Sequence, residues 1–137
     1  MTNFEKTADL GGRILISAMF LLSGIGKIGA YAGTQAYMQS QGVPGALLPL
    51  VIALEVVGAI AIIIGWRTRL FAFLLAGFSI VSAAIFHSAL GDQTQFLLFM
   101  KNVAMAGGFL FLVARGPGDW SLDARNERLS APEARRA

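Results

Sequence analysis

The sequence predicts an all-α, polytopic membrane protein: a four-transmembrane-helix bundle with both termini in the cytoplasm (N-in/C-in). Three observations predict this fold. Only 14% of the 137 residues are charged, whereas soluble domains are about a quarter charged. Four apolar stretches are each long enough to cross ~30 Å of hydrocarbon as a helix. Lysine and arginine flank these stretches on one side only, which the positive-inside rule assigns to the cytoplasm.

The four predicted spans are Leu10–Ile28, Ala46–Trp66, Leu70–His87 and Phe96–Ala114. The third is the clearest, because residues 71–86 contain no charge and two serines are their only polar side chains. A helix of a soluble bundle would show a polar face. In the first span, Arg13 is expected to extend its side chain toward the membrane surface. The predicted division is therefore an N-terminal segment 1–9, a transmembrane domain 10–115 and a C-terminal tail 116–137.

The basic residues set the predicted orientation. They precede the first span, link the second to the third, and follow the fourth, whereas residues 29–45 carry no charge and residues 89–95 carry only Asp92. We therefore expect a multi-pass protein of the inner (cell) membrane with the lipid bilayer as its surroundings. Residues 31–41 suit a short helix lying in the membrane interface. The tail is expected to become disordered from about Leu129.

Composition excludes several classes of function. The chain has no cysteine, which removes disulfides, thiolate metal sites and a dithiol relay within this polypeptide. One histidine without cysteine is a poor ligand set, so no metal site is predicted. The net charge of +3 is explained by the residues that flank the spans, and nucleic-acid binding is not expected.

Ionisable side chains inside the spans mark the candidate site. Such groups cost several kcal/mol unless they are paired, so each is a functional hypothesis. Lys27 and His87 lie at the outer ends of their spans; Lys101 lies ~8 Å deep and Glu55 ~14 Å deep at 1.5 Å per residue. All four fall in the outer half of the predicted bundle. We expect them to share a polar pocket that opens away from the cytoplasm.

Glu55 and Lys101 are predicted to form a buried ion pair, with Asn102 donating a hydrogen bond to it. Their depths differ by about one helical turn. The pair is either a ligand or proton site or a device that only fixes helix register, as buried polar pairs sometimes do. His87 is either a proton donor near neutral pH or an interfacial residue with ordinary hydrogen bonds.

The first span carries a stripe of residues at helical spacing. Arg13, Ser17, Phe20, Ser23 or Gly24, and Lys27 follow one another at three or four positions, so they lie on one face of the helix. Phe20 and Ser23 are predicted to face the bundle interior beneath Lys27. The candidate ligand-binding residues are Phe20, Ser23, Lys27, Glu55, His87, Lys101 and Asn102.

The order and spacing of several short motifs resemble the DoxX family of small membrane proteins. These motifs are Arg13 followed by residues 20–27, Gly42-Val43-Pro44, residues 55–58, Gly65-Trp66-Arg67-Thr68-Arg69, Lys101-Asn102 with Gly107-Gly108, and residues 116–123. The resemblance covers Gly12 to Asp123 and implies a four-helix membrane bundle. It also implies a link to membrane-bound redox and sulfur metabolism, since the family is named after a subunit associated with thiosulfate:quinone oxidoreductase. It supplies no catalytic motif to transfer.

Three functions fit the sequence. The first is a subunit or accessory of a membrane-bound oxidoreductase, catalytic or not, that contacts a quinone with His87 or Lys101 and relays a proton through Glu55. Apolar walls with a few convergent polar groups suit a quinone. The second is a binding or transport protein for a small polar or anionic metabolite, attracted by Lys27 and Lys101, which would work as a homo-oligomer. The third is a structural partner protein that docks another membrane or soluble redox protein through its arginine-rich tail.

Overall fold

The computed structural model describes residues 1–134, and these residues fold into helices joined by short turns. The helices are α1 (Asn3–Gly29), α2 (Tyr31–Ser40), the 3-10 helix η1 (Gly45–Leu47), α3 (Leu48–Ile64), α4 (Thr68–Phe86), α5 (Gln93–Arg115) and α6 (Leu122–Ala134). Within the described residues, α1, α3 with η1, α4 and α5 are long and apolar enough to span a membrane. The four predicted spans are confirmed, and the predicted short helix after the first span is present as α2.

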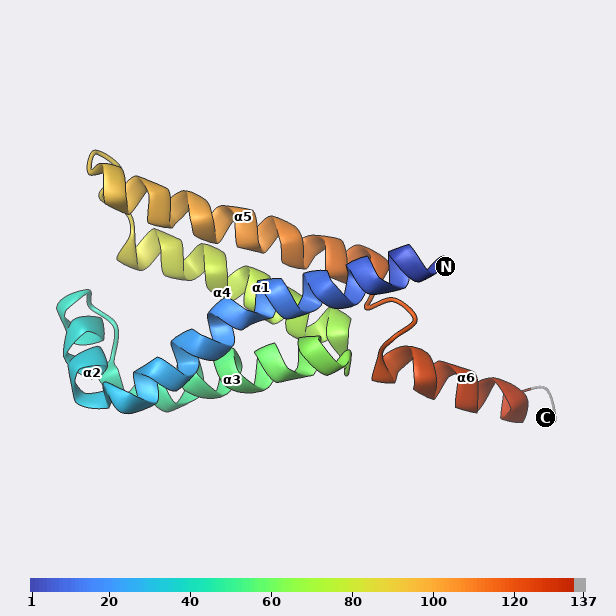
Figure 1. Ribbon diagram of the computed structural model, residues 1–137. Coiled ribbons are helices and arrows are strands. Elements are labelled where there is room, and N and C mark those ends of the chain that lie inside the picture. The colour runs from blue at the N-terminus through green and yellow to red at the C-terminus, as the bar shows by residue number, and fades with distance from the viewer. Residues whose placement is uncertain (135–137) are drawn as a thin grey trace.

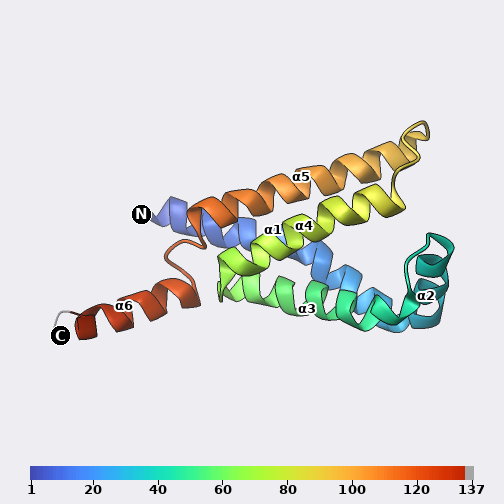
Figure 2. The same ribbon diagram turned by 180° about the vertical axis from the view of Figure 1, so that it is seen from behind.

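The four long helices pack as two pairs. Helix α1 packs mainly on α3 and α4 mainly on α5, and contact between α3 and α4 joins the pairs. Figures 1 and 2 show the pairs diverging toward one end of the bundle, where α2 and the turn between α4 and α5 lie. We call this the α2 end. The N-terminus, the turn between α3 and α4, and α6 lie at the opposite, terminal end.

The helix boundaries follow from local capping. Helix α1 begins seven residues before the predicted span because the Thr2 side chain accepts from the Glu5 amide and the Glu5 side chain accepts from the Thr2 amide. This capping box satisfies amides that the first turn leaves free. Helix α3 ends at Gly65, whose φ of 73° lies in the left-handed region that glycine adopts without strain.

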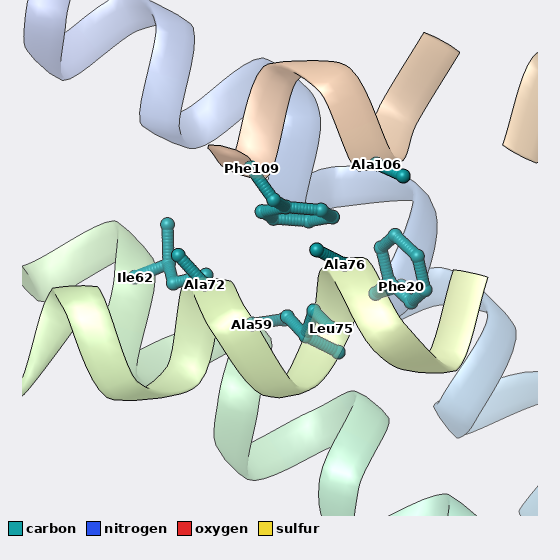
Figure 3. Close-up of a cluster of buried hydrophobic side chains, with 8 residues drawn as sticks. All are labelled: Phe20, Ala59, Ile62, Ala72, Leu75, Ala76, Ala106 and Phe109. Atoms are coloured by element: carbon teal, nitrogen blue, oxygen red, sulfur yellow. The ribbon is translucent and has the colours of Figure 1, made fainter. Parts of the chain in front are cut away.

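The core lies where the two helix pairs cross. Phe20, Ala59, Ile62, Ala72, Leu75, Ala76, Ala106 and Phe109 form one buried cluster drawn from α1, α3, α4 and α5 (Figure 3). Phe20 packs edge-on against Phe109 with ring centroids 5.4 Å apart. Such aromatic pairs add about 0.5–1.5 kcal/mol beyond the area they bury. The alanines allow the backbones of α3, α4 and α5 to approach closely.

The side chain of Arg13 reaches the terminal end of the bundle, which the sequence analysis assigns to the cytoplasmic membrane surface, and protein covers it there. Its side chain is only 1% exposed and points into the terminal end of the bundle. It donates to the carbonyls of Ile62 at 3.1 Å and Ile63 at 2.8 Å, and also to that of Trp120. The last carbonyls of a helix lack an amide four residues on; that of Ile62 also accepts from the Gly65 amide at 3.2 Å. An arginine offers five donors in a fixed fork that reaches several such carbonyls.

The tail contains a helix that the sequence analysis did not predict. Helix α6 continues through Ala134, where disorder was expected from about Leu129; residues 135–137 lie outside the described part of the chain. Asp123, in the first turn of α6, accepts from the amides of Arg67 at 2.8 Å and Thr68 at 2.9 Å. It thereby caps the N-terminus of α4 and ties the tail to the bundle.

Candidate functional site

All seven predicted site residues line one cavity in the bundle. The cavity has a volume of about 160 Å³. Its lining comprises Met19, Phe20, Ser23, Lys27, Glu55, Phe78, Ser79, Ser82, His87, Lys101, Asn102 and Met105. These residues come from α1, α3, α4 and α5 and from the residue that ends α4. The predicted convergence of charges from different helices is therefore present, and we call this space the polar cavity.

The partner of Glu55 is Lys27 and not the predicted Lys101. Lys27 Nζ lies 2.6 Å from Glu55 Oε1 and 2.7 Å from the hydroxyl of Ser23, one turn earlier on α1. The prediction matched depths along the membrane normal, but α3 packs on α1 and α4, whereas α5 packs mainly on α4. Glu55 therefore meets the cation on its neighbouring helix.

The second carboxylate oxygen of Glu55 has no partner among the described residues. The Glu55 side chain is 2% exposed, and no described donor reaches Oε2. A buried charge costs much less when it is paired and fully hydrogen-bonded. The Lys27 pair meets half of that requirement, so Glu55, which lines the polar cavity, keeps a buried acceptor without a described donor.

A glycine on α1 lets the ion pair form. A Cβ atom on Gly24 would lie 2.7 Å from Val56 Cγ2 and 3.1 Å from Glu55 Cβ. A real side chain would push α1 away from α3. Gly24 also belongs to the buried face of α1, together with Arg13, Ser17 and Phe20, which confirms the predicted stripe.

The predicted role of Asn102 is also wrong. Its side-chain amide donates 3.2 Å to the backbone carbonyl of Ser79 and so links α5 to α4. Lys101, one residue earlier, lines the polar cavity. Two ion pairs are found among the side chains of residues 1–131, Lys6–Asp119 and Lys27–Glu55, and neither includes Lys101. The lining of the cavity therefore includes a lysine without an acidic partner among the described side chains.

His87 ends α4 and connects it to α5. Its Nδ1 lies 3.0 Å from Oε1 of Gln95 in the first turn of α5. If Nδ1 carries the proton, it donates to Gln95 and leaves Nε2 as an acceptor. His87 lines the polar cavity and also a neighbouring pocket, so the two spaces share this residue.

The neighbouring pocket is larger and mostly apolar. It has a volume of about 350 Å³ and shares Lys27, Phe78, Ser82 and His87 with the polar cavity. Its other lining residues are Thr34, Tyr37, Met38, Val43, Leu47, Val51, Val81, Ile85 and Phe86. We call it the apolar pocket. Tyr37 of α2 stacks on Phe86 of α4 with ring centroids 5.4 Å apart, so α2 covers the space between the diverging helix pairs.

The sequence analysis missed these apolar lining residues. An apolar side chain in a membrane span carries no signal that separates lipid contact from ligand contact. Only the aromatic and methionine content of residues 31–41 distinguished α2 from a plain loop. That it covers a pocket depends on how the helix pairs diverge.

Comparison with known proteins places the chain in a family. The DoxX family model matches residues 8–88. The chain is 47% identical over 123 residues to the inner membrane protein YqjF of Escherichia coli, covering 90% of this chain and 95% of that protein. The chain belongs to the DoxX family. It is also 38% identical to the Escherichia coli inner membrane protein YphA, over 82% of this chain and 86% of that protein. No solved structure matches.

Membership of the DoxX family agrees with the helices described above. The chain is an integral membrane protein, and its relatives YqjF and YphA are inner membrane proteins. The region that matches the DoxX model runs from α1 to the end of α4, so it contains Lys27, Glu55 and His87. Lys101 and Asn102 on α5 lie beyond it.

Proposed function

We propose that this DoxX protein binds a quinone between its helix pairs and serves as a subunit or accessory of a membrane-bound oxidoreductase. The observation that carries the proposal is the buried, unpartnered Oε2 of Glu55, a residue that lines the same cavity as Lys101. Buried polar groups that the fold leaves unpaired in a cavity are candidates for ligand contact.

The sizes and linings of the two spaces support a ring-bearing ligand with an apolar body. A cavity of about 150 Å³ in another protein accommodates a benzene molecule, and the polar cavity measures about 160 Å³. One ring with its carbonyls would occupy the polar cavity, where Lys101 is the available donor; His87 donates there through Nε2 only when both ring nitrogens carry a proton. A second ring or an isoprenoid chain would occupy the apolar pocket of about 350 Å³.

The same side chains could transfer the protons that quinone reduction requires. Quinone reduction takes up two electrons and two protons. In the proposed role the electrons come from a partner protein, since this chain has no cysteine to relay them. Glu55 would exchange a proton with a ring oxygen, because it lines the space where that ring would lie and one of its carboxylate oxygens has no described donor.

The binding test uses purified protein in detergent and 1,4-naphthoquinone as the probe. Wild type is expected to bind it, and Glu55→Gln to bind at least about tenfold more weakly, because Lys27 loses the charge that holds it and the polar lining rearranges. Glu127→Gln changes an exposed residue of α6 and is the matched control, expected to bind as wild type does. Equal, negligible binding by all three proteins would overturn the proposal.

The oxidoreductase role needs a separate test in native membranes. Membranes from a strain that lacks the protein are expected to reduce or oxidise added quinone more slowly. Wild type and Glu127→Gln should restore the rate, and Glu55→Gln should not. Unchanged rates in the deletion strain would overturn the oxidoreductase role. Quinone binding itself is decided by the binding experiment above.

A further inference from the structure

The polar cavity carries one positive charge in excess. Lys27 and Glu55 neutralise each other through their ion pair. Lys101 lines the same cavity and has no acidic partner among the described side chains, residues 1–131. Of the other lining residues only His87 is ionisable, and it adds positive charge or none. Glu55 is thus the single acidic side chain of the lining, and its charge is already balanced.

An unbalanced ammonium in a membrane bundle favours an anionic ligand. Desolvation penalises the charged form of a lysine unless an opposite charge lies nearby. A ligand that places one negative charge near Lys101 provides that opposite charge. It also leaves the cavity neutral as a whole, which a neutral ligand does not.

The remaining Glu55 oxygen limits how much negative charge the ligand can carry. Oε2 is buried and has no described donor, so it repels a second negative charge placed within a few ångströms. A monoanion can turn its charged oxygen toward Lys101 and an uncharged edge toward Glu55. A compact dianion exposes charge to both residues, so the lining selects against it.

We infer that the polar cavity selects a ring-bearing monoanion, such as a quinone with an acidic ring hydroxyl, over a neutral ring of the same shape, and that Lys101 sets this selectivity. The inference rests on the ligand site of the proposed function and specifies its substrate class. The apolar pocket that shares Lys27 and His87 with the cavity takes the rest of such an amphipathic molecule.

Matched ligands test the inference. Binding of 2-hydroxy-1,4-naphthoquinone, which is ionised at neutral pH, is compared with that of its neutral 2-methoxy ether by calorimetry. Wild type is expected to bind the hydroxyquinone at least about tenfold more tightly, the ratio that 1.4 kcal/mol gives. Lys101→Gln should lose this preference and Lys101→Arg, which keeps the charge, should retain it. Lys6→Gln, at the terminal end, is the control and should behave as wild type.

The outcomes separate this inference from the proposed function. Equal affinity of wild type for both quinones, or an unchanged preference in Lys101→Gln, would overturn the inference and leave quinone binding standing. Binding of 2-naphthoate but of no quinone, lost in Lys101→Gln, would support selection of a monoanion and overturn the quinone proposal. Binding of none of these ligands would overturn both. Circular dichroism and thermal unfolding of each variant show whether it remains folded. If Lys101→Gln does not fold, the preference of wild type and of Lys101→Arg for the hydroxyquinone over its methoxy ether still tests the inference.

Discussion

Lys27 Nζ and Glu55 Oε1 lie 2.6 Å apart although 28 residues separate them along the chain. The pair joins α1 to α3 near the α2 end, where the two helix pairs diverge (Figure 1). Glu55 is almost fully buried, whereas about a quarter of the Lys27 side chain is exposed. The contact therefore fixes one buried carboxylate oxygen and leaves the other without a described donor.

Breaking this pair from one side should cost more than replacing both partners. Removing one member of a buried pair leaves an uncompensated charge and costs about 3–5 kcal/mol, whereas apolar replacement of both is often neutral. We expect Lys27→Met to lower the free energy of unfolding more than the double variant Lys27→Met/Glu55→Leu. Unfolding in mixed micelles of increasing denaturing detergent measures this. A double variant less stable than the single one would contradict the expectation.

Gly24 offers a test of the close approach between α1 and α3. Gly24→Ala should destabilise the protein by about 1–3 kcal/mol, the usual cost of overpacking, because its Cβ would lie 2.7 Å from Val56 Cγ2. Gly26→Ala is the matched control on the same helix, since a Cβ there meets no atom within 4 Å. Similar thermal unfolding of the two variants would show that the approach is not as tight as described.

Arg13 should not tolerate replacement by lysine. Lysine keeps the charge but lacks the planar fork that reaches several carbonyls at once. Each lost hydrogen bond to the charged group costs about 1.5–3 kcal/mol, so Arg13→Lys should lower the thermal unfolding temperature by several degrees. Arg125→Lys, at an exposed position of α6, should leave it unchanged. Equal stability of the two variants would contradict the assigned contacts.

The Asp123 cap predicts a smaller effect. Asp123→Ala removes the acceptor for the amides of Arg67 and Thr68, and loss of a helix cap costs about 0.5–2 kcal/mol. Hydrogen exchange of those two amides should accelerate, while exchange in the middle of α4 changes little. Exchange at Arg67 and Thr68 as slow as in wild type would show that the tail does not hold this helix end.

The predicted orientation can be tested because the chain has no cysteine. Single cysteines at Ser40, Ser88 and Ser130, all exposed positions, become the only thiols. With both termini in the cytoplasm, a membrane-impermeant maleimide added to spheroplasts should label Ser40→Cys and Ser88→Cys. It should label Ser130→Cys only after lysis. The reverse pattern would invert the orientation.

The sequence by itself determined the number of spans, their approximate ends and the buried face of α1. These depend on hydropathy, length and helical periodicity, which are local properties of the chain. The buried residues Arg13, Ser17, Phe20 and Gly24 follow the predicted stripe because 3.6 residues per turn fixes which side chains share a face. Convergence of the ionisable residues on one cavity followed from the cost of charge in lipid.

Only the tertiary structure decided which groups meet. Depth along the membrane normal suggested Lys101 as the partner of Glu55, but lateral neighbours are set by the packing order of the helices, and α3 lies against α1. The same order placed Arg13 beside the end of α3, where the carbonyls of Ile62 and Ile63 accept from its guanidinium. The apolar pocket depends on how the two helix pairs diverge, and no local pattern of residues encodes that angle.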